Sequence, residues 1–133
     1  MKKILLFCAF CMISMLNAQL TISTNYREDG VWNADKNEWV IESTEEGLTV
    51  FNFDSKFSSF THITKSITSE YEILDWDYDE KEVLYEMTVK SDAGNTYDFL
   101  VDGINDYIIF FYTDSDNSYR MVRHTVSDSS FKE

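Results

Sequence analysis

The feature that most constrains this chain is the run at 70–90, EYEILDWDYDEKEVLYEMTVK, in which apolar and charged residues alternate along most of its length. A period of two residues is typical of a β-strand with one buried face. A four-residue turn at 79–82 would fold the run into a hairpin of two such strands. Because a register shift of one residue would exchange the two faces, the sequence specifies the pairing strongly.

The two faces of this predicted hairpin differ sharply in polarity. One face carries Asp77 and places Asp75 opposite Glu86, so it is acidic. The apolar alternation changes phase at Ile73-Leu74, where a β-bulge would restore a single buried face. The six residues predicted to form the buried face are Leu74, Trp76, Tyr78, Val83, Tyr85 and Met87.

Short β-type runs separated by turn residues continue through the rest of the chain. Leu20, Ile22, Thr24 and Tyr26 alternate with polar residues, and Asp29-Gly30 suits a bulge. The runs recur every 8–12 residues or so without helical periodicity, a pattern typical of sandwiches and barrels. Short connections favour antiparallel pairing of successive strands. The sequence therefore predicts an all-β fold, a single antiparallel meander of about eight to nine strands in a closed or nearly closed barrel.

The first 18 residues have the character of a secretory signal peptide. Lys2 and Lys3 precede an apolar run at 4–16, and Ala18 offers a small residue for cleavage. The apolar run is too short to span a bilayer, which needs about 20 residues. The predicted organisation is a signal peptide at 1–18, an all-β domain at 19–125 and a flexible tail at 126–133. We therefore expect a secreted or periplasmic protein whose mature chain is not inserted in a membrane.

Cysteine positions and charge narrow the classes of function further. Cys8 and Cys11 both lie within the predicted leader, so the mature domain would have no thiol or disulfide. Without Lys2 and Lys3, nine basic residues face 24 acidic ones, a formal charge of −15. This charge disfavours nucleic acid and anionic membranes as partners. It is compatible with a basic protein partner, with a bound cation, or with solubility alone.

The candidate metal and catalytic residues form incomplete patterns. Asp75, Asp77 and Asp79 with Glu86 imitate the spacing of a calcium loop, but Glu80 occupies the position that needs glycine. A looser divalent site between Asp75 and Glu86 remains an alternative to a solvated acidic face.

The two histidines, His62 and His124, lie within predicted strands, and no acidic residue lies within two positions of either. They lack the third ligand of a metal site and the supporting acid of a catalytic one. The prediction is therefore a protein that is not an enzyme, with no catalytic residue, no metal and no cofactor.

Aromatic residues are abundant for a chain of this length, at 16% of all residues. They suit either the core of a cysteine-free domain or the lining of a cavity, as in barrels that hold one small molecule. The candidate ligand-binding residues are Trp32, Trp39, Trp76, Tyr85 and Tyr107.

Short motifs also resemble those of lipocalin-like barrels. Gly30-Val31-Trp32 resembles the G-x-W motif of that family, and Asn105-Asp106-Tyr107 resembles its T-D-Y motif with Asn in place of Thr. The resemblance implies a ligand-binding barrel in which Arg120 or Arg123 closes over Trp32. In its leader and small acidic meander, the chain is also similar to small exported proteins of Bacteroidetes-type bacteria, which implies export and no particular activity.

Two functions follow from these patterns. The first is a non-enzymatic barrel that binds a small apolar ligand in an aromatic-lined interior, with a cavity of roughly 300 Å³ or more. The second is an acidic protein–protein interaction module, for instance an inhibitor of a basic secreted protein, that uses the acidic face of the 70–90 hairpin.

Overall fold

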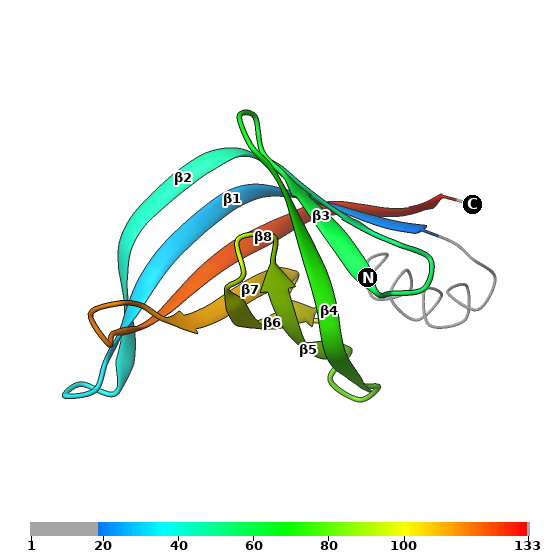
Figure 1. Ribbon diagram of the computed structural model, residues 1–133. Helices are drawn as coiled ribbons and strands as arrows, with labels where there is room; N and C mark the ends of the chain where they lie inside the picture. Colours follow the sequence, from blue (N-terminus) through cyan, green and yellow to red (C-terminus); the bar gives the residue numbers. More distant parts are fainter. Residues whose placement is uncertain (1–18, 133) are drawn as a thin grey trace.

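The structure, a computed structural model, describes residues 19–132, which form an all-β barrel of eight strands. Each strand pairs antiparallel with the next along the chain, and β8 pairs with β1, so the meander closes on itself (Figure 1). The predicted fold class is confirmed, whereas the predicted signal peptide at 1–18 lies outside the described residues. The strands are β1 (Gln19–Asn33), β2 (Glu38–Phe53), β3 (Ser59–Ile63), β4 (Thr68–Asp79), β5 (Leu84–Ser91), β6 (Thr96–Asp102), β7 (Tyr107–Thr113) and β8 (Tyr119–Lys132).

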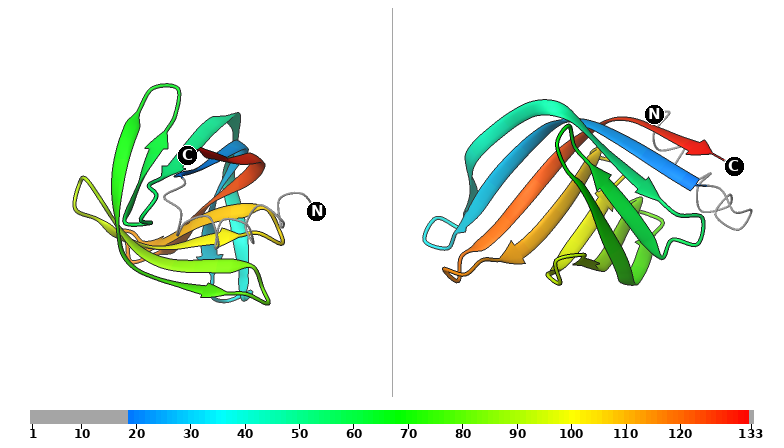
Figure 2. Two further views of the ribbon diagram at one scale, coloured as in Figure 1. Left: turned by 90° about the vertical axis from the view of Figure 1, so that its right-hand side faces the viewer. Right: turned by 45° about the horizontal axis from the view of Figure 1, so that its top comes forward.

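Strands β1, β2 and β8 are the longest and form one curved wall of the barrel (Figure 2). β1 pairs with β2 from Leu20 to Asn33 and with β8 from Gln19 to Val31. The β8 pairing extends to Lys132, well past Thr125, where the sequence pattern placed the end of the folded domain. Residues expected to form a tail therefore contribute backbone hydrogen bonds to the barrel wall.

Four turns of the meander are stabilised in the same way. In each, an aspartate side chain accepts hydrogen bonds from backbone N–H groups that follow it in the sequence. Asp79 accepts from the N–H of Lys81 and Glu82 at 3.0 and 3.2 Å. Asp54, Asp102 and Asp114 make equivalent contacts at the β2–β3, β6–β7 and β7–β8 turns. Short side chains of this kind fix tight turns by replacing a backbone acceptor. Part of the acidic excess of the chain therefore serves its turns.

The core is a layer of phenylalanine rings that crosses the barrel. Phe99 lies at its centre, with ring centroids 4.8 Å from Phe60 and 4.7 Å from Phe110. Phe51 lies 6.2 Å from both Phe99 and Phe110, and all four side chains are buried. Further phenylalanine and tyrosine rings continue the packing toward the end of the barrel that holds the chain termini. The buried rings on that side are Phe53, Phe57 and Tyr85.

The barrel closes through a short seam between β2 and the β3–β4 hairpin. β2 pairs with β3 only from Val50 to Phe53, and β4 beyond Glu72 pairs with β5 alone. At one end of the seam Phe57 packs against Trp76 and Tyr85, with ring centroids 5.2 and 5.1 Å apart. The other end of the seam, beside residues 45–50 in the middle of β2, is a hollow that leads into the barrel.

The 70–90 hairpin forms with the two predicted faces, but its two strands pair in a different register from the predicted one. Its turn occupies residues 80–83 and pairs Trp76 with Met87 and Tyr78 with Tyr85. The register differs from the expected one by two residues, and an even shift leaves each side chain on its own face. The predicted bulge is confirmed by the register shift between Ile73 and Asp75.

The predicted core of this hairpin is right for three residues of six. Val83, Tyr85 and Met87 are buried, and Tyr78 is half-buried against the core. The prediction is wrong for Leu74 and Trp76, which are 50% and 48% exposed. Leu74 is the bulged residue, and Trp76 lies on the part of β4 that has no second neighbouring strand. Which side chains of this hairpin are buried depends on how the barrel closes, and the local alternation of apolar and polar residues does not predict that closure.

Candidate functional site

A cavity of about 240 Å³ lies inside the barrel on the side of the phenylalanine layer away from the termini. Six strands contribute to its wall, which is aromatic, imidazole-rich and nearly free of aliphatic groups. The interior of the barrel is therefore packed at one end and hollow at the other. The residues that line the cavity are Arg27, His62, Tyr71, Tyr97, Phe110, Tyr112, Val122 and His124.

Arg27 enters the cavity because β1 changes phase. The pairing of β1 with both of its neighbours shifts between Thr24 and Tyr26, and Asn25 is the extra residue toward β8. The buried Thr24 hydroxyl donates to the Thr49 carbonyl at this point, at 3.0 Å. A bulge moves the following side chains to the opposite face. Arg27, which simple alternation places on the outer surface, consequently lines the interior.

Asp29 holds the Arg27 side chain in place. Nε and Nη2 of Arg27 donate to the two carboxylate oxygens of Asp29 at 2.7 and 3.0 Å. Such two-point contacts fix the plane of a guanidinium group. They leave further N–H donors of Arg27 for a ligand, because a guanidinium group has five.

The two histidines meet across the barrel beside Phe51. Their ring centroids lie 5.9 Å apart, and each ring is within about 5 Å of the Phe51 ring, at 5.0 Å for His62 and 5.2 Å for His124. His124 is only 1% exposed. Nδ1 of His124 and Nε2 of His62 have no hydrogen-bond partner among the described residues. A buried polar atom without a partner costs stability, so these nitrogens call for an explanation.

Both imidazoles are held in the neutral state at pH 7. Burial lowers the pKa of His124 to about 3, with smaller contributions from His62 and Arg27 and an opposing effect of the Asp29 carboxylate. Burial also lowers the pKa of His62 to about 4, with a smaller contribution from Arg27. A second positive charge beside Arg27 is therefore unfavourable unless a negative charge accompanies it.

Three tyrosines complete the polar part of the wall. Tyr97 packs edge-on against Tyr112 at 5.6 Å and lies 6.1 Å from Tyr71. Burial, with smaller effects of Tyr97 and Asp92, raises the pKa of Tyr71 to about 12, and burial also raises the pKa of Tyr112. The hydroxyls of Tyr71 and Tyr112 thus stay protonated and can donate hydrogen bonds to a ligand.

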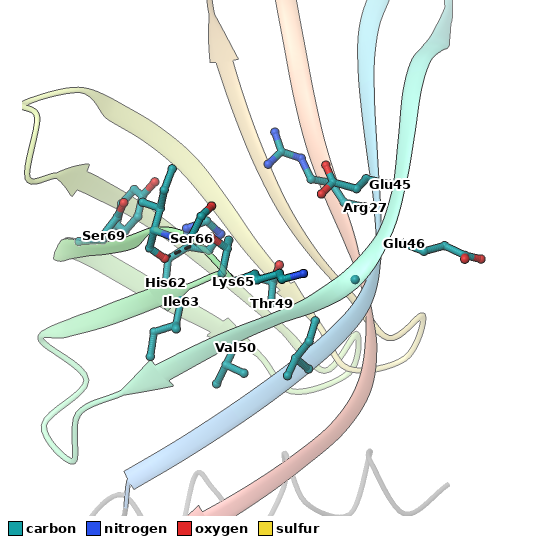
Figure 3. Close-up of a pocket in the computed structure, with 15 residues that line it drawn as sticks. Arg27, Glu45, Glu46, Thr49, Val50, His62, Ile63, Lys65, Ser66 and Ser69 are labelled. Carbon is teal, nitrogen blue, oxygen red and sulfur yellow. Dashed lines mark hydrogen bonds between the residues drawn. The ribbon is translucent and has the colours of Figure 1, made fainter.

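The cavity opens sideways through the seam between β2 and the β3–β4 hairpin. A hollow of about 710 Å³ lies at this opening and shares Arg27, His62 and Tyr71 with the cavity. Figure 3 shows Arg27 and His62 on facing sides of the opening. Leu48 and Ile67 stand at its rim and are 63% and 60% exposed. Glu45, Glu46 and Lys65 also line this hollow, so the access route for a small organic molecule is bordered by both apolar and charged groups.

None of the five predicted ligand-binding residues is among those that line the cavity or its opening. Trp32 and Trp39 pack edge-on against each other with ring centroids 5.3 Å apart, and Trp39 also contacts Tyr119 and Phe111. Trp76 lies at the edge of β4, and Tyr85 is buried in the packed end. Tyr107 lies beneath the Arg123 guanidinium at 4.7 Å. The aromatic residues that line the cavity are therefore different from those that the sequence pattern predicts.

Gly30 is tightly packed between β1's two neighbouring strands, β2 and β8. Gly30 is buried, and a Cβ atom there would lie 3.2 Å from Cε of Met121 and 3.3 Å from the Val40 carbonyl oxygen. The register shift between Asp29 and Gly30 confirms the predicted bulge. The glycine of the Gly30-Val31-Trp32 motif thus has a packing role, because the β2 backbone and Met121 approach it closely.

The acidic face of the 70–90 hairpin lies outside the barrel. Asp77 pairs with Glu86, and Asp75 pairs with Thr88, so the expected opposition of Asp75 and Glu86 does not occur. Asp98 joins them from β6, and together these residues border a surface hollow of about 410 Å³. No group of three or more potential metal ligands is found among residues 19–132.

Comparison with protein-family models, with curated proteins and with solved structures gives no match. Within the described part of the chain, no helix has the length and apolar character needed to cross a membrane. The geometry of the cavity and of the acidic face is therefore the basis for assigning a function.

The buried histidines predict a pH dependence of stability. Each has a pKa below its unfolded value of about 6.5, so the unfolded chain binds more protons and stability falls as pH drops through the window from about 6.5 to 3. In urea unfolding, His124→Leu should lose less stability on acidification than the wild type. The gap between the two proteins should change by about 1 kcal/mol per pH unit between pH 6 and 4. Parallel pH profiles for both proteins would show that His124 is not held neutral by the fold.

Proposed function

We propose that this protein is an exported, non-enzymatic barrel that binds a small organic molecule in the cavity beside His62 and His124. The observation that carries the proposal is a hollow barrel end with polar groups converging on it. Natural binding sites combine an aromatic wall with a few fixed polar groups in this way. The cavity is connected to solvent through the opening at Leu48 and Ile67, so a ligand has a route to it.

A binding role accounts for the histidines better than a catalytic one. The Nδ1 atom of His124, which a carboxylate would hold in a catalytic arrangement, has no partner. Neutral imidazole next to tyrosine hydroxyls instead provides hydrogen-bonding groups for a ligand. Imidazole nitrogens can serve as donor or acceptor according to tautomer, which suits recognition of a polar substituent.

The size of the cavity favours a ligand with a single ring. An apolar cavity of about 150 Å³ is large enough to hold benzene. At about 240 Å³, the cavity here has room for one substituted ring, and the larger hollow outside can hold an attached group. The proposed ligand is therefore aromatic and polar at one end. It differs in this polar group from the apolar ligand that the sequence predicts.

Phenol is a suitable first probe because it is small, aromatic and uncharged at neutral pH. We expect a dissociation constant of roughly 0.1–5 mM, the range available to so few ligand atoms. Val122 lines the cavity, so Val122→Phe should fill it and weaken phenol binding at least about tenfold, while Val122→Ile should weaken it less. Isothermal titration of the wild type and both variants measures this.

The matched control is Thr113→Phe, which adds the same ring at an exposed position on β7. This variant should bind phenol as the wild type does, and thermal unfolding should confirm that all variants are folded. Phenol binding that survives in Val122→Phe would place the ligand elsewhere and refute the proposal.

We propose, as a second candidate function, that the acidic face binds a basic protein. The observation in its favour is that Asp75, Asp77, Glu86 and Asp98 gather at one surface hollow beside apolar Leu100 and Phe111. Acidic groups arranged around an apolar centre match a Lys- or Arg-rich surface.

A hexalysine peptide tests the second candidate by its salt dependence. Binding should weaken between about 0.05 and 0.3 M NaCl, because screening shortens the reach of exposed charges. The triple variant Asp77→Asn, Glu86→Gln, Asp98→Asn should lose most of the affinity. The charge-matched variant Asp35→Asn, Glu46→Gln, Asp128→Asn changes exposed acids elsewhere and should keep it. Equal losses in both variants would mean that net charge alone attracts the peptide.

A further inference from the structure

The cavity wall stands out in this acidic protein because it contains no carboxylate. The chain has 24 acidic residues and 11 basic ones, yet Arg27 is the single charged residue among the eight that line the cavity. The Asp29 partner of Arg27 is not part of the wall. Arg27 therefore lines the cavity, whereas the carboxylate that pairs with it does not.

The other polar groups of the wall can all donate hydrogen bonds. Tyr71, Tyr97 and Tyr112 contribute hydroxyl groups, and burial raises the pKa of Tyr71 and of Tyr112. His124 is almost completely buried and has an unpartnered nitrogen, and His62 has a second one. A neutral imidazole can present an N–H to an oxygen anion by choice of tautomer. The wall thus has one cation, several donors and no carboxylate, whereas Glu45 and Glu46 line the hollow at the opening.

From these features, and on the basis of the proposed function, we infer that the ligand is a small aromatic carboxylate or an equivalent aromatic oxyanion. Its ring would lie among Tyr97, Tyr112 and Phe110, and its anionic group would face Arg27 and the two imidazoles. Charge-assisted hydrogen bonds to a guanidinium group are among the strongest that a protein can offer an oxyanion. In addition, an anion here would supply hydrogen-bond acceptors for the unpartnered nitrogens, whose burial is otherwise unfavourable.

Because the protein is strongly acidic overall, anion binding at Arg27 can be distinguished from non-specific electrostatic attraction. With 24 acidic residues, the surface repels anions and attracts cations. An anionic probe that binds more tightly than its neutral and cationic analogues therefore reports the local field of Arg27. Lys65 is the other basic residue at the opening and serves as the control for a peripheral charge.

The test compares three probes of nearly the same shape: benzoate, benzamide and benzamidine. Titration of the wild type at pH 7 and low salt should rank benzoate above benzamide by about fivefold or more, with benzamidine weakest. In the double variant Arg27→Gln, Asp29→Asn, which removes both members of the ion pair, the preference for benzoate should disappear while benzamide still binds. Lys65→Gln should keep the preference for benzoate.

The outcomes separate this inference from the proposed function. If benzamide or benzamidine binds the wild type as tightly as benzoate, the cavity accepts aromatic ligands but the inferred anion preference is wrong. If the preference is lost in Lys65→Gln and kept in the double variant, the anion is held at the rim, and the assignment to Arg27 is overturned. If none of the three probes binds, both the inference and the proposed function fail.

Discussion

The aromatic layer centred on Phe99 is the interaction on which the rest of this structure depends. β2 and β3 pair only from Val50 to Phe53, so backbone hydrogen bonds supply little of the closure at the seam. The rings of Phe51, Phe60 and Phe110 meet Phe99 from three other strands and hold the two sides together. Burial of large aromatic side chains is among the strongest single contributions to folding. The same layer forms the floor of the cavity, so closure and site share one set of contacts.

The seam itself explains why the cavity is accessible. A barrel whose strands all paired along their full length would enclose its interior. Here the first half of β2 pairs with β1 alone, and β3 is short. Phe57 fills one end of the resulting gap by packing on Trp76 and Tyr85, whereas the end near Leu48 and Ile67 remains open. Because only one end of the gap is open, a ligand can enter the cavity from that end alone.

Much of the fold could be predicted from sequence, because the period of two and the turn residues are local signals. The all-β meander, the bulges at Ile73-Leu74 and Asp29-Gly30 and the two faces of the 70–90 hairpin all follow from such signals. Alternation predicts Leu74 and Trp76 in the core, but Leu74 is the bulged residue and Trp76 lies where β4 has no second neighbouring strand.

The cavity residues could not be found in the same way. Arg27 lines the interior because the extra residue at Asn25 changes the phase of β1, and a polar asparagine in a polar stretch gives no warning of a bulge. His62 and His124 are 62 positions apart and meet only through the closure of the barrel. A weak signal did exist for His62, since the strand that holds it is otherwise apolar or neutral. That signal indicates burial and does not by itself indicate which residues meet.

The most direct test of a barrel that is packed at one end and hollow at the other is the location of a bound aromatic probe. Intermolecular nuclear Overhauser effects between phenol and assigned aromatic protons measure it in solution. The structure predicts contacts with the rings of Tyr97, Tyr112 and His124. Contacts confined to Trp39 and Tyr119 on the outer cluster would contradict the account, because the aromatic surface that binds would then lie outside the barrel.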